Sequence, residues 1–205
     1  LRLGRLNVFI GGNGSGKSNL ISVFHFLNRV IAGDLQTYTG EAGGADSILY
    51  FGRKQSPSLT VELEFGTGSY ANGYAFTLRP TAEDQFIFSS ETIWFHDRTR
   101  YPNPLSIDLG SGYAEARVKQ STERIAGHVR DDLASYRIYH FHDTSSSARV
   151  KQTGAVDDNR RLQPDAGNLA AFLYRLQQTH SGYFKNIEDT IRQIAPFFEG
   201  FRLEP

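Results

Sequence analysis

Hydrophobic residues near the start of the chain change from a continuous run to a helical repeat. Residues 6–10 (LNVFI) form a short apolar run with β-branched and aromatic side chains, which favours a buried strand. Over residues 20–31 the apolar side chains recur at steps of three and four, which is typical of an amphipathic helix, and Gly33 follows as its expected terminator. The pattern predicts a strand, a connecting loop and a helix.

The hydrophobic period changes beyond this helix. Residues 34–44 are polar and contain glycine, so we expect a loop there. After them, apolar and polar residues alternate in short segments separated by turn residues, which indicates an antiparallel sheet with one face in water. We expect its strands at residues 59–65, 74–78, 85–95 and 106–109, with 114–119 as a further candidate.

The rest of the chain is mainly helical in pattern. A short helix is expected over residues 124–134 and a strand over 137–141, followed by a long polar loop over 143–163. Asp165 would cap a helix that contains Leu169 to Leu176. A last helix contains Phe184 to Ile194 and ends at Pro196.

No internal repeat or low-complexity linker divides the chain, so we expect residues 1–205 to form one domain. Within it we expect the strand, loop and first helix at 1–33, the antiparallel sheet at 46–119, and helices, a strand and the long loop at 124–205.

The segment between the first strand and helix has the spacing of a phosphate-binding loop. Gly11 is followed, after four residues, by Gly16, Lys17 and Ser18. Glycines allow successive backbone amides to turn inward around an anion, and a helix start faces that anion with its positive end. Lys17 would reach the β and γ phosphates, and the Ser18 hydroxyl would be a ligand of Mg²⁺. The candidate nucleotide-binding residues are Gly11, Gly12, Asn13, Gly14, Ser15, Gly16, Lys17, Ser18 and Asn19.

Composition indicates the cellular compartment of the protein but does not decide whether it binds nucleic acid. Lysine plus arginine equals aspartate plus glutamate at 22 each, so no overall basic field argues for nucleic acid. The absence of cysteine excludes disulfides and thiolate metal sites and fits a reducing compartment. No apolar run is long enough for a membrane span, and no signal peptide opens the chain, so we expect a soluble, cytoplasmic protein without a membrane partner.

Hydrolysis of a nucleotide needs groups that the sequence does not identify. An apolar strand that ends in aspartate would hold Mg²⁺ and orient the attacking water. The nearest segments are residues 93–97 and 138–143, and both interrupt the continuous apolar pattern of a buried parallel strand. We therefore name no catalytic residue in this chain. An Asn-Lys-x-Asp motif for guanine is also absent, which disfavours a GTPase.

Two other groups of polar residues have open interpretations. His140 and His142, with Asp143 next to them, could ligate a metal or position a water near the γ-phosphate, although a packing role is favoured. Basic residues of the long loop could contact a phosphodiester backbone, but neighbouring aspartates favour a solvated loop. These basic residues are Arg149, Lys151, Arg160 and Arg161.

The sequence LNVFIGGNGSGKSNLISVFHFL resembles the phosphate-loop region of the RecF and structural-maintenance-of-chromosomes branch of ABC ATPases. The segments GGADSILYFGRK, RIYHFHDTSSSARVKQ, DAGNLAAFLYRL and IAPFFEGFRLEP are similar to bacterial AAA-type, RecF-like ATPases without long coiled coils. The resemblance implies an α/β P-loop NTPase fold, in which an ABC-ATPase-like N-terminal lobe carries an antiparallel β subdomain and C-terminal helices. It also implies a strand or two before Leu1, and the signature helix and Walker-B strand after Pro205. In one departure, residues 35–44 lack the arginine that chromosome-maintenance proteins usually place after this helix.

This resemblance implies an ATP-binding lobe that takes ATP and Mg²⁺, and that hydrolyses ATP when completed by a second lobe and by a second protomer in an ATP-dependent homodimer. The chain alone is then expected to be inactive as an ATPase. The alternative is a nucleotide-gated DNA- or effector-binding clamp in DNA repair or anti-phage defence, whose main output is dimerisation. A small-molecule kinase is a third, less favoured hypothesis, and DNA stays open as a partner.

Overall fold

The computed structural model describes residues 1–4, 7–66, 68–139, 145 and 147–204. Its internal contacts divide the chain into two compact units, Leu1–Tyr136 and Arg137–Pro205, and each is described here by itself. Our expectation of a single lobe over residues 1–205 stays a prediction. Within the described residues no helix is both long and apolar enough to cross a membrane.

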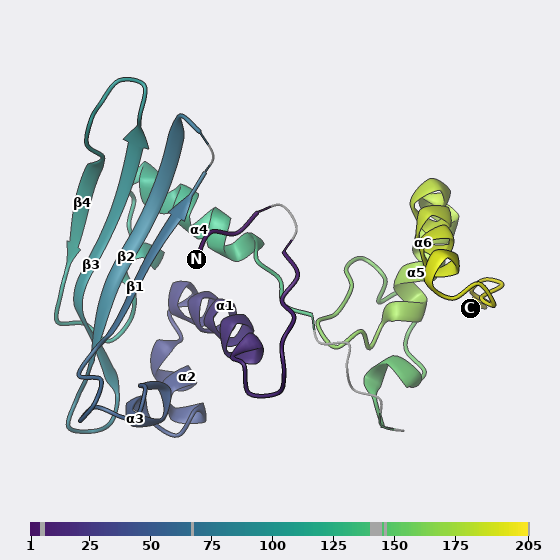
Figure 1. Ribbon diagram of the computed structural model, residues 1–205, viewed down its shortest axis with the longest axis horizontal. Coiled ribbons are helices and arrows are strands. Elements are labelled where there is room, and N and C mark those ends of the chain that lie inside the picture. The colour runs from purple at the N-terminus through teal and green to yellow at the C-terminus, as the bar shows by residue number, and fades with distance from the viewer. Residues whose placement is uncertain (5–6, 67, 140–144, 146, 205) are drawn as a thin grey trace. The chain divides into compact units, whose positions relative to one another are not determined.

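A four-stranded antiparallel sheet is the centre of the first unit (Figure 1). The strands are β1 (Leu59–Phe65), β2 (Tyr70–Pro80), β3 (Phe86–Asp97) and β4 (Leu105–Gly110), and they lie in sequence order. The four strands expected from the alternating pattern are therefore confirmed. The further candidate at 114–119 is wrong, because residues 117–119 form a 3₁₀ helix, η1 (Arg117–Lys119).

Two bulges reverse the alternation within this sheet. Thr77 of β2 pairs with Ser90 and Leu78 with Phe88, so Ser89 is an extra residue in β3. Because one inserted residue shifts the alternation, Phe88 and Ile93 both face the core although an odd number of positions separates them. Leu109 is the corresponding extra residue in β4, between the pairs of Glu91 with Gly110 and Thr92 with Asp108.

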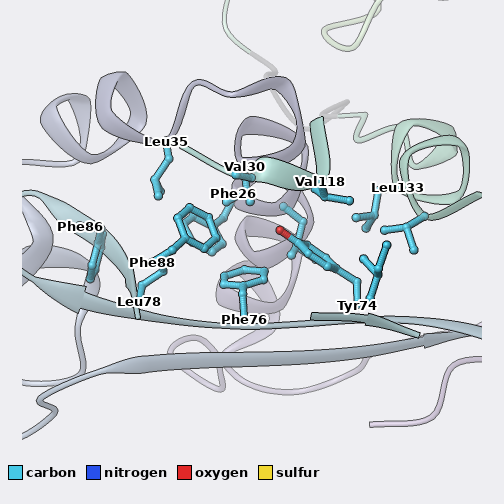
Figure 2. Close-up of a cluster of buried hydrophobic side chains, with 14 of the residues drawn as sticks. Phe26, Val30, Leu35, Tyr74, Phe76, Leu78, Phe86, Phe88, Val118 and Leu133 are labelled. Atoms are coloured by element: carbon cyan, nitrogen blue, oxygen red, sulfur yellow. The ribbon is translucent and has the colours of Figure 1, made fainter. Parts of the chain in front are cut away.

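Helices cover one face of the sheet (Figure 1). They are α1 (Lys17–Ala32), α2 (Leu35–Glu41), α3 (Ala45–Ile48) and α4 (Arg124–Ser135). The expected helices over 20–31 and 124–134 are confirmed, and Gly33 ends α1 in the left-handed conformation. Figure 2 shows aromatic side chains of β2 and β3 pointing toward α1, α2 and η1. The largest fully buried apolar side chains are Leu27, Val30, Leu35, Tyr74, Phe76, Leu78, Phe86, Phe88, Ile93, Val118 and Leu133.

The loop expected at 34–44 is wrong, because most of this segment is helix α2. A side chain distant in the sequence caps the N-terminus of this helix. The Glu115 carboxylate accepts hydrogen bonds from the backbone N–H groups of Leu35 (2.9 Å) and Gln36 (3.0 Å). Leu35 is also fully buried in the core. A local pattern gives no sign of a cap that lies 80 residues away.

A buried carboxylate fixes η1 against the sheet. Glu91 of β3 is fully buried, and its oxygens accept hydrogen bonds from the Tyr74 hydroxyl (2.8 Å) and from the backbone N–H groups of Arg117 (2.9 Å) and Val118 (3.0 Å). These amides would otherwise be unpaired at the start of a helical turn. The hydrogen bonds that the Glu91 oxygens accept thus explain why residues 117–119 turn instead of continuing as a strand.

Trp94, the single tryptophan, lies on the face of the sheet opposite the helices, where its ring covers a glycine of the neighbouring strand. Gly73 of β2 pairs directly with Trp94 of β3, and a Cβ atom built on Gly73 would fall about 2 Å from atoms of the indole ring. The ring therefore occupies the space that a side chain at position 73 would need.

We expect Gly73→Ala to destabilise the first unit by about 1–3 kcal/mol, because the indole ring must leave its place over the strand. Urea unfolding followed by Trp94 fluorescence measures the loss, and the native emission should shift to the red as the ring becomes hydrated. Gly40→Ala, in α2, is the control for the indole contact, because Gly40 has no positive φ angle and an added Cβ there meets no atom within 4 Å. A native emission unchanged by Gly73→Ala would contradict the contact.

Buried Tyr74 and half-buried Tyr113 should make the stability of the first unit sensitive to alkali. Burial raises the pKa of Tyr74 and of Tyr113 well above the ordinary value, and the nearby Glu91 carboxylate adds to both shifts. Above the pKa of an unfolded tyrosine, about 10, the unfolded chain loses these protons while the folded chain keeps them. The free energy of unfolding is therefore expected to be independent of these two groups below about pH 10 and to fall above it. Absorbance at 295 nm should show Tyr74 and Tyr113 titrating only as the protein unfolds, and their ionisation in the folded protein near pH 10 would contradict the expectation.

The second unit contains α5 (Leu169–Thr179), α6 (Ser181–Ile194) and a short 3₁₀ turn, η2 (Arg149–Lys151). Both expected C-terminal helices are confirmed, but α5 begins after Asn168 instead of Asp165. Asn168 is buried: its side chain accepts the Gln163 N–H (2.8 Å) and donates to the carbonyls of Asp158 and Arg161 (2.8 Å each). The side-chain amide of Asn168 therefore holds the last part of the polar loop together. Of the strand expected at 137–141, residues 137–139 are irregular and 140–141 lie outside the described residues.

Candidate functional site: the loop before α1

The glycine-rich segment lies where the sequence predicted it, directly before the first helix. Residues 11–16 lead into α1, and Lys17 is the first residue of that helix. The strand expected at 6–10 is not formed by its described residues, 7–10, which pair with no strand in the described chain. Val8 and Ile10 are 75% and 92% exposed. A strand needs a neighbouring backbone to complete its hydrogen bonds, and local β propensity cannot supply one.

Glycines let the chain turn into the helix. Gly14 and Gly16 have φ angles of 80° and 86°, in the left-handed region that side-chain-bearing residues rarely adopt. Gly16 is also the N-cap of α1 and provides no side-chain cap. Substitution at either position would strain the backbone at the point where the loop becomes helix.

Lys17 folds back over the loop. Its ammonium group donates hydrogen bonds to the carbonyl oxygens of Gly11 and Gly12, each at 2.7 Å, and to the Ser15 hydroxyl at 3.0 Å. The Ser15 amide donates to the Gly12 carbonyl at 3.3 Å. These contacts bring the two ends of the loop together around a single positive charge. The sequence did not indicate the Ser15 contact, although a hydroxyl two residues from the lysine was a signal that could have been used.

The first turn of α1 presents donors toward solvent. The first bond of the helical ladder runs from the Leu20 amide to the Gly16 carbonyl (3.0 Å), so the amides of residues 17–19 precede the ladder. No acidic side chain lies in the first turn to offset the positive end of the helix dipole. The side chains of Ser18 and Asn19 are exposed. Free amides, a lysine and exposed hydroxyls are a donor set suited to an anion with many oxygens.

The other candidate residues do not form a second site in the described part of the chain. Asp97 ends an antiparallel strand, and its carboxylate accepts the Thr99 hydroxyl (2.6 Å) and amide (3.0 Å), which lower its pKa. Asp97 therefore closes a turn. His140, His142 and Asp143 lie outside the described residues. Arg149 contacts Asp165 at 3.5 Å.

No group of three or more histidine, aspartate or glutamate side chains that could hold a metal occurs among the described residues.

Comparison with known proteins identifies the family. The profile of a family described as AAA domain, putative AbiEii toxin, Type IV TA system, matches residues 6–195. The chain belongs to this family. Membership supports a P-loop NTPase fold and a nucleotide-binding, ATPase-type function, and the match includes the whole loop before α1. No curated protein and no solved structure matches the chain significantly.

Proposed function

We propose that this AAA domain binds ATP together with Mg²⁺ through Gly11–Asn19, as the nucleotide-binding lobe of a RecF/SMC-like ATPase. The observation that carries the proposal is the position of Lys17, at the start of a helix and over a loop in which Gly14 and Gly16 take left-handed conformations. Family membership agrees with this nucleotide-binding role. Few arrangements other than a phosphate site bring these features together.

The residues of the loop fit a triphosphate with its metal. The amides of residues 17–19 would donate to phosphate oxygens, and the Lys17 ammonium would exchange its carbonyl partners for the β and γ phosphates. The exposed Ser18 hydroxyl would hold Mg²⁺, which when bound neutralises charge on the phosphates. The chain's own contribution to phosphoryl transfer is therefore orientation and electrostatic stabilisation.

Hydrolysis would require residues from a second lobe and a second protomer, as the resemblance to RecF/SMC-like ATPases implies. Apolar side chains support this part of the proposal: Val8 and Ile10 before the loop and Ile21 after it are exposed. An apolar surface on both sides of a binding loop is suited to packing against further strands. We expect turnover by this chain alone to be negligible.

A second candidate function is a nucleotide-gated clamp that acts on an effector in anti-phage defence. The family description, a putative toxin of a type IV toxin–antitoxin system, favours defence over DNA repair as the setting. In this case ATP would control association of two copies, and hydrolysis would only reset the clamp. Light scattering with and without ATP·Mg²⁺ distinguishes this output, because ATP should raise the average mass.

Titration calorimetry of the full chain tests nucleotide binding. ATP with Mg²⁺ should bind measurably, ATP with a chelator more weakly, and AMP weakest, because AMP lacks the β and γ phosphates that Lys17 and Ser18 would contact. Bound ligand should also raise the melting temperature with its concentration. Absence of heat and of thermal stabilisation at millimolar ATP·Mg²⁺, with folded protein, would refute the proposal.

A further inference from the structure

Two adjacent aromatic rings project into solvent from the loop after α3. Tyr50 and Phe51 are 73% and 79% exposed, and their ring centroids lie 4.5 Å apart in an edge-to-face arrangement. We call this pair the aromatic knuckle. Large aromatic side chains are more often buried, and exposed ones are enriched where proteins associate.

The knuckle is held in one conformation at the cost of backbone strain. Phe51 has a φ angle of 54°, which is rare for a bulky residue, and Gly52 follows at 72°. The Ser56 hydroxyl donates to the Tyr50 carbonyl (2.8 Å), and the Gly52 amide donates to the Leu49 carbonyl (3.0 Å). Strain of this kind persists where the surroundings enforce it, and it often marks a functional surface. The rings are therefore pre-organised for contact.

Arg53 attaches this loop to the turn between β2 and β3. Its guanidinium donates to Asp46 (2.8 Å), to the carbonyl of Thr81 (2.6 Å) and to Asp84. The side-chain hydrogen bond from Arg53 is the main reason that the pKa of Asp46 is lowered. The knuckle thus sits on a fixed scaffold at one end of the sheet.

Charges around the knuckle do not suit a polyanion. Arg53 is engaged by Asp46 and Asp84, and the other charged side chains of the loop at 49–58 and of the β2–β3 turn at 81–85 are Lys54 and Glu83, which are exposed and of opposite sign. A surface for nucleic acid or anionic lipid needs an excess of free cations. A patch with an apolar centre and both signs of charge is instead self-complementary, since a two-fold axis can place Lys54 of one copy opposite Glu83 of another.

We propose that the aromatic knuckle is the centre of a two-fold, nucleotide-independent contact between two copies of this chain. A fully buried aromatic side chain removes about 150–250 Å² from water, so each copy has about 300 Å² of ring surface to bury. The rings of two copies give about 600 Å², below the roughly 1,200 Å² of a stable specific interface, and flanking side chains supply part of the difference. The dimer is therefore weak, with a Kd on the order of 10–100 µM.

Sedimentation velocity of the full chain without nucleotide, from about 1 to 300 µM, tests the dimer. The wild type should shift from monomer to dimer, and Tyr50→Ser with Phe51→Ser should raise the Kd at least about tenfold, because it removes the buried ring surface. Tyr101→Ser removes another exposed ring (62%) from the connection at the opposite end of β3 and should leave the Kd unchanged. A monomer over the whole range, or a dimer that persists in the double variant, overturns the proposal.

Cross-linking gives an independent readout, because the chain has no cysteine of its own. Gln55→Cys, next to the knuckle, should form a covalent dimer with a short bis-maleimide at 50 µM, whereas Asn103→Cys in the β3–β4 connection should not. Equal cross-linking of the two variants contradicts a contact at the knuckle. Lys17→Ala should not alter either result, so failure of nucleotide binding and failure of this dimer are distinguishable.

Discussion

Replacing Lys17 with alanine is expected to weaken ATP·Mg²⁺ binding by about 10- to 100-fold or to abolish it in a calorimetric titration. The ammonium is the only side-chain cation of the loop, and a charge-assisted hydrogen bond to a phosphate is worth about 1.5–3 kcal/mol. The substitution also removes the contacts to Gly11, Gly12 and Ser15 that close the loop. The lost phosphate contact and the lost closure of the loop both weaken nucleotide binding.

Lys54→Ala is the matched control, since Lys54 is an exposed lysine that belongs to the loop after α3. It should bind ATP·Mg²⁺ as the wild type does. The melting temperature of Lys17→Ala without ligand should stay close to that of the wild type, because the lysine is near the surface. Unchanged affinity in Lys17→Ala would show that the loop is not the nucleotide site.

Glu91→Ala is expected to lower the free energy of unfolding of the first unit by about 3–5 kcal/mol. The substitution leaves the Tyr74 hydroxyl and the amides of Arg117 and Val118 without their acceptor in a buried place, and it opens a cavity. Each unpaired buried donor costs about 1–3 kcal/mol, although relaxation recovers part of the sum. Urea unfolding followed by Trp94 fluorescence gives the value.

Glu91→Gln should cost less, because the amide keeps the volume and one acceptor oxygen. Glu62→Ala removes a carboxylate from the exposed side of β1 and should change stability by no more than about 0.5 kcal/mol. If Glu91→Ala and Glu62→Ala unfold at the same urea concentration, the buried carboxylate does not stabilise η1 as we infer.

Local sequence patterns were sufficient to predict the helices and strands that neighbouring residues specify. Alternation predicted β1 to β4, and helical spacing predicted α1, α4, α5 and α6. Gly33 ends α1 in a left-handed conformation for which glycine is suited, so its role was also readable from the residue type. The loop from Gly11 to Lys17 was predictable for the same reason, since its chemistry lies in consecutive residues.

Elements that depend on distant partners were missed or misassigned. Helix α2 begins at amides capped by Glu115, and η1 replaces a strand because Glu91 holds its amides. The segment at 7–10 has a strand-like sequence, but it pairs with no described strand. In each case the deciding hydrogen bonds join residues that the local sequence does not connect.

The sequence by itself determined the phosphate-binding spacing and the alternation of the sheet, because both are set by residue types at fixed short intervals. Only the tertiary structure decided that Lys17 closes the loop on the carbonyls of Gly11 and Gly12, and that a bulge at Ser89 brings Glu91 into the core. Hydrogen-bond partners and strand register are chosen by the packing of the whole unit, so they become visible only when the chain is folded.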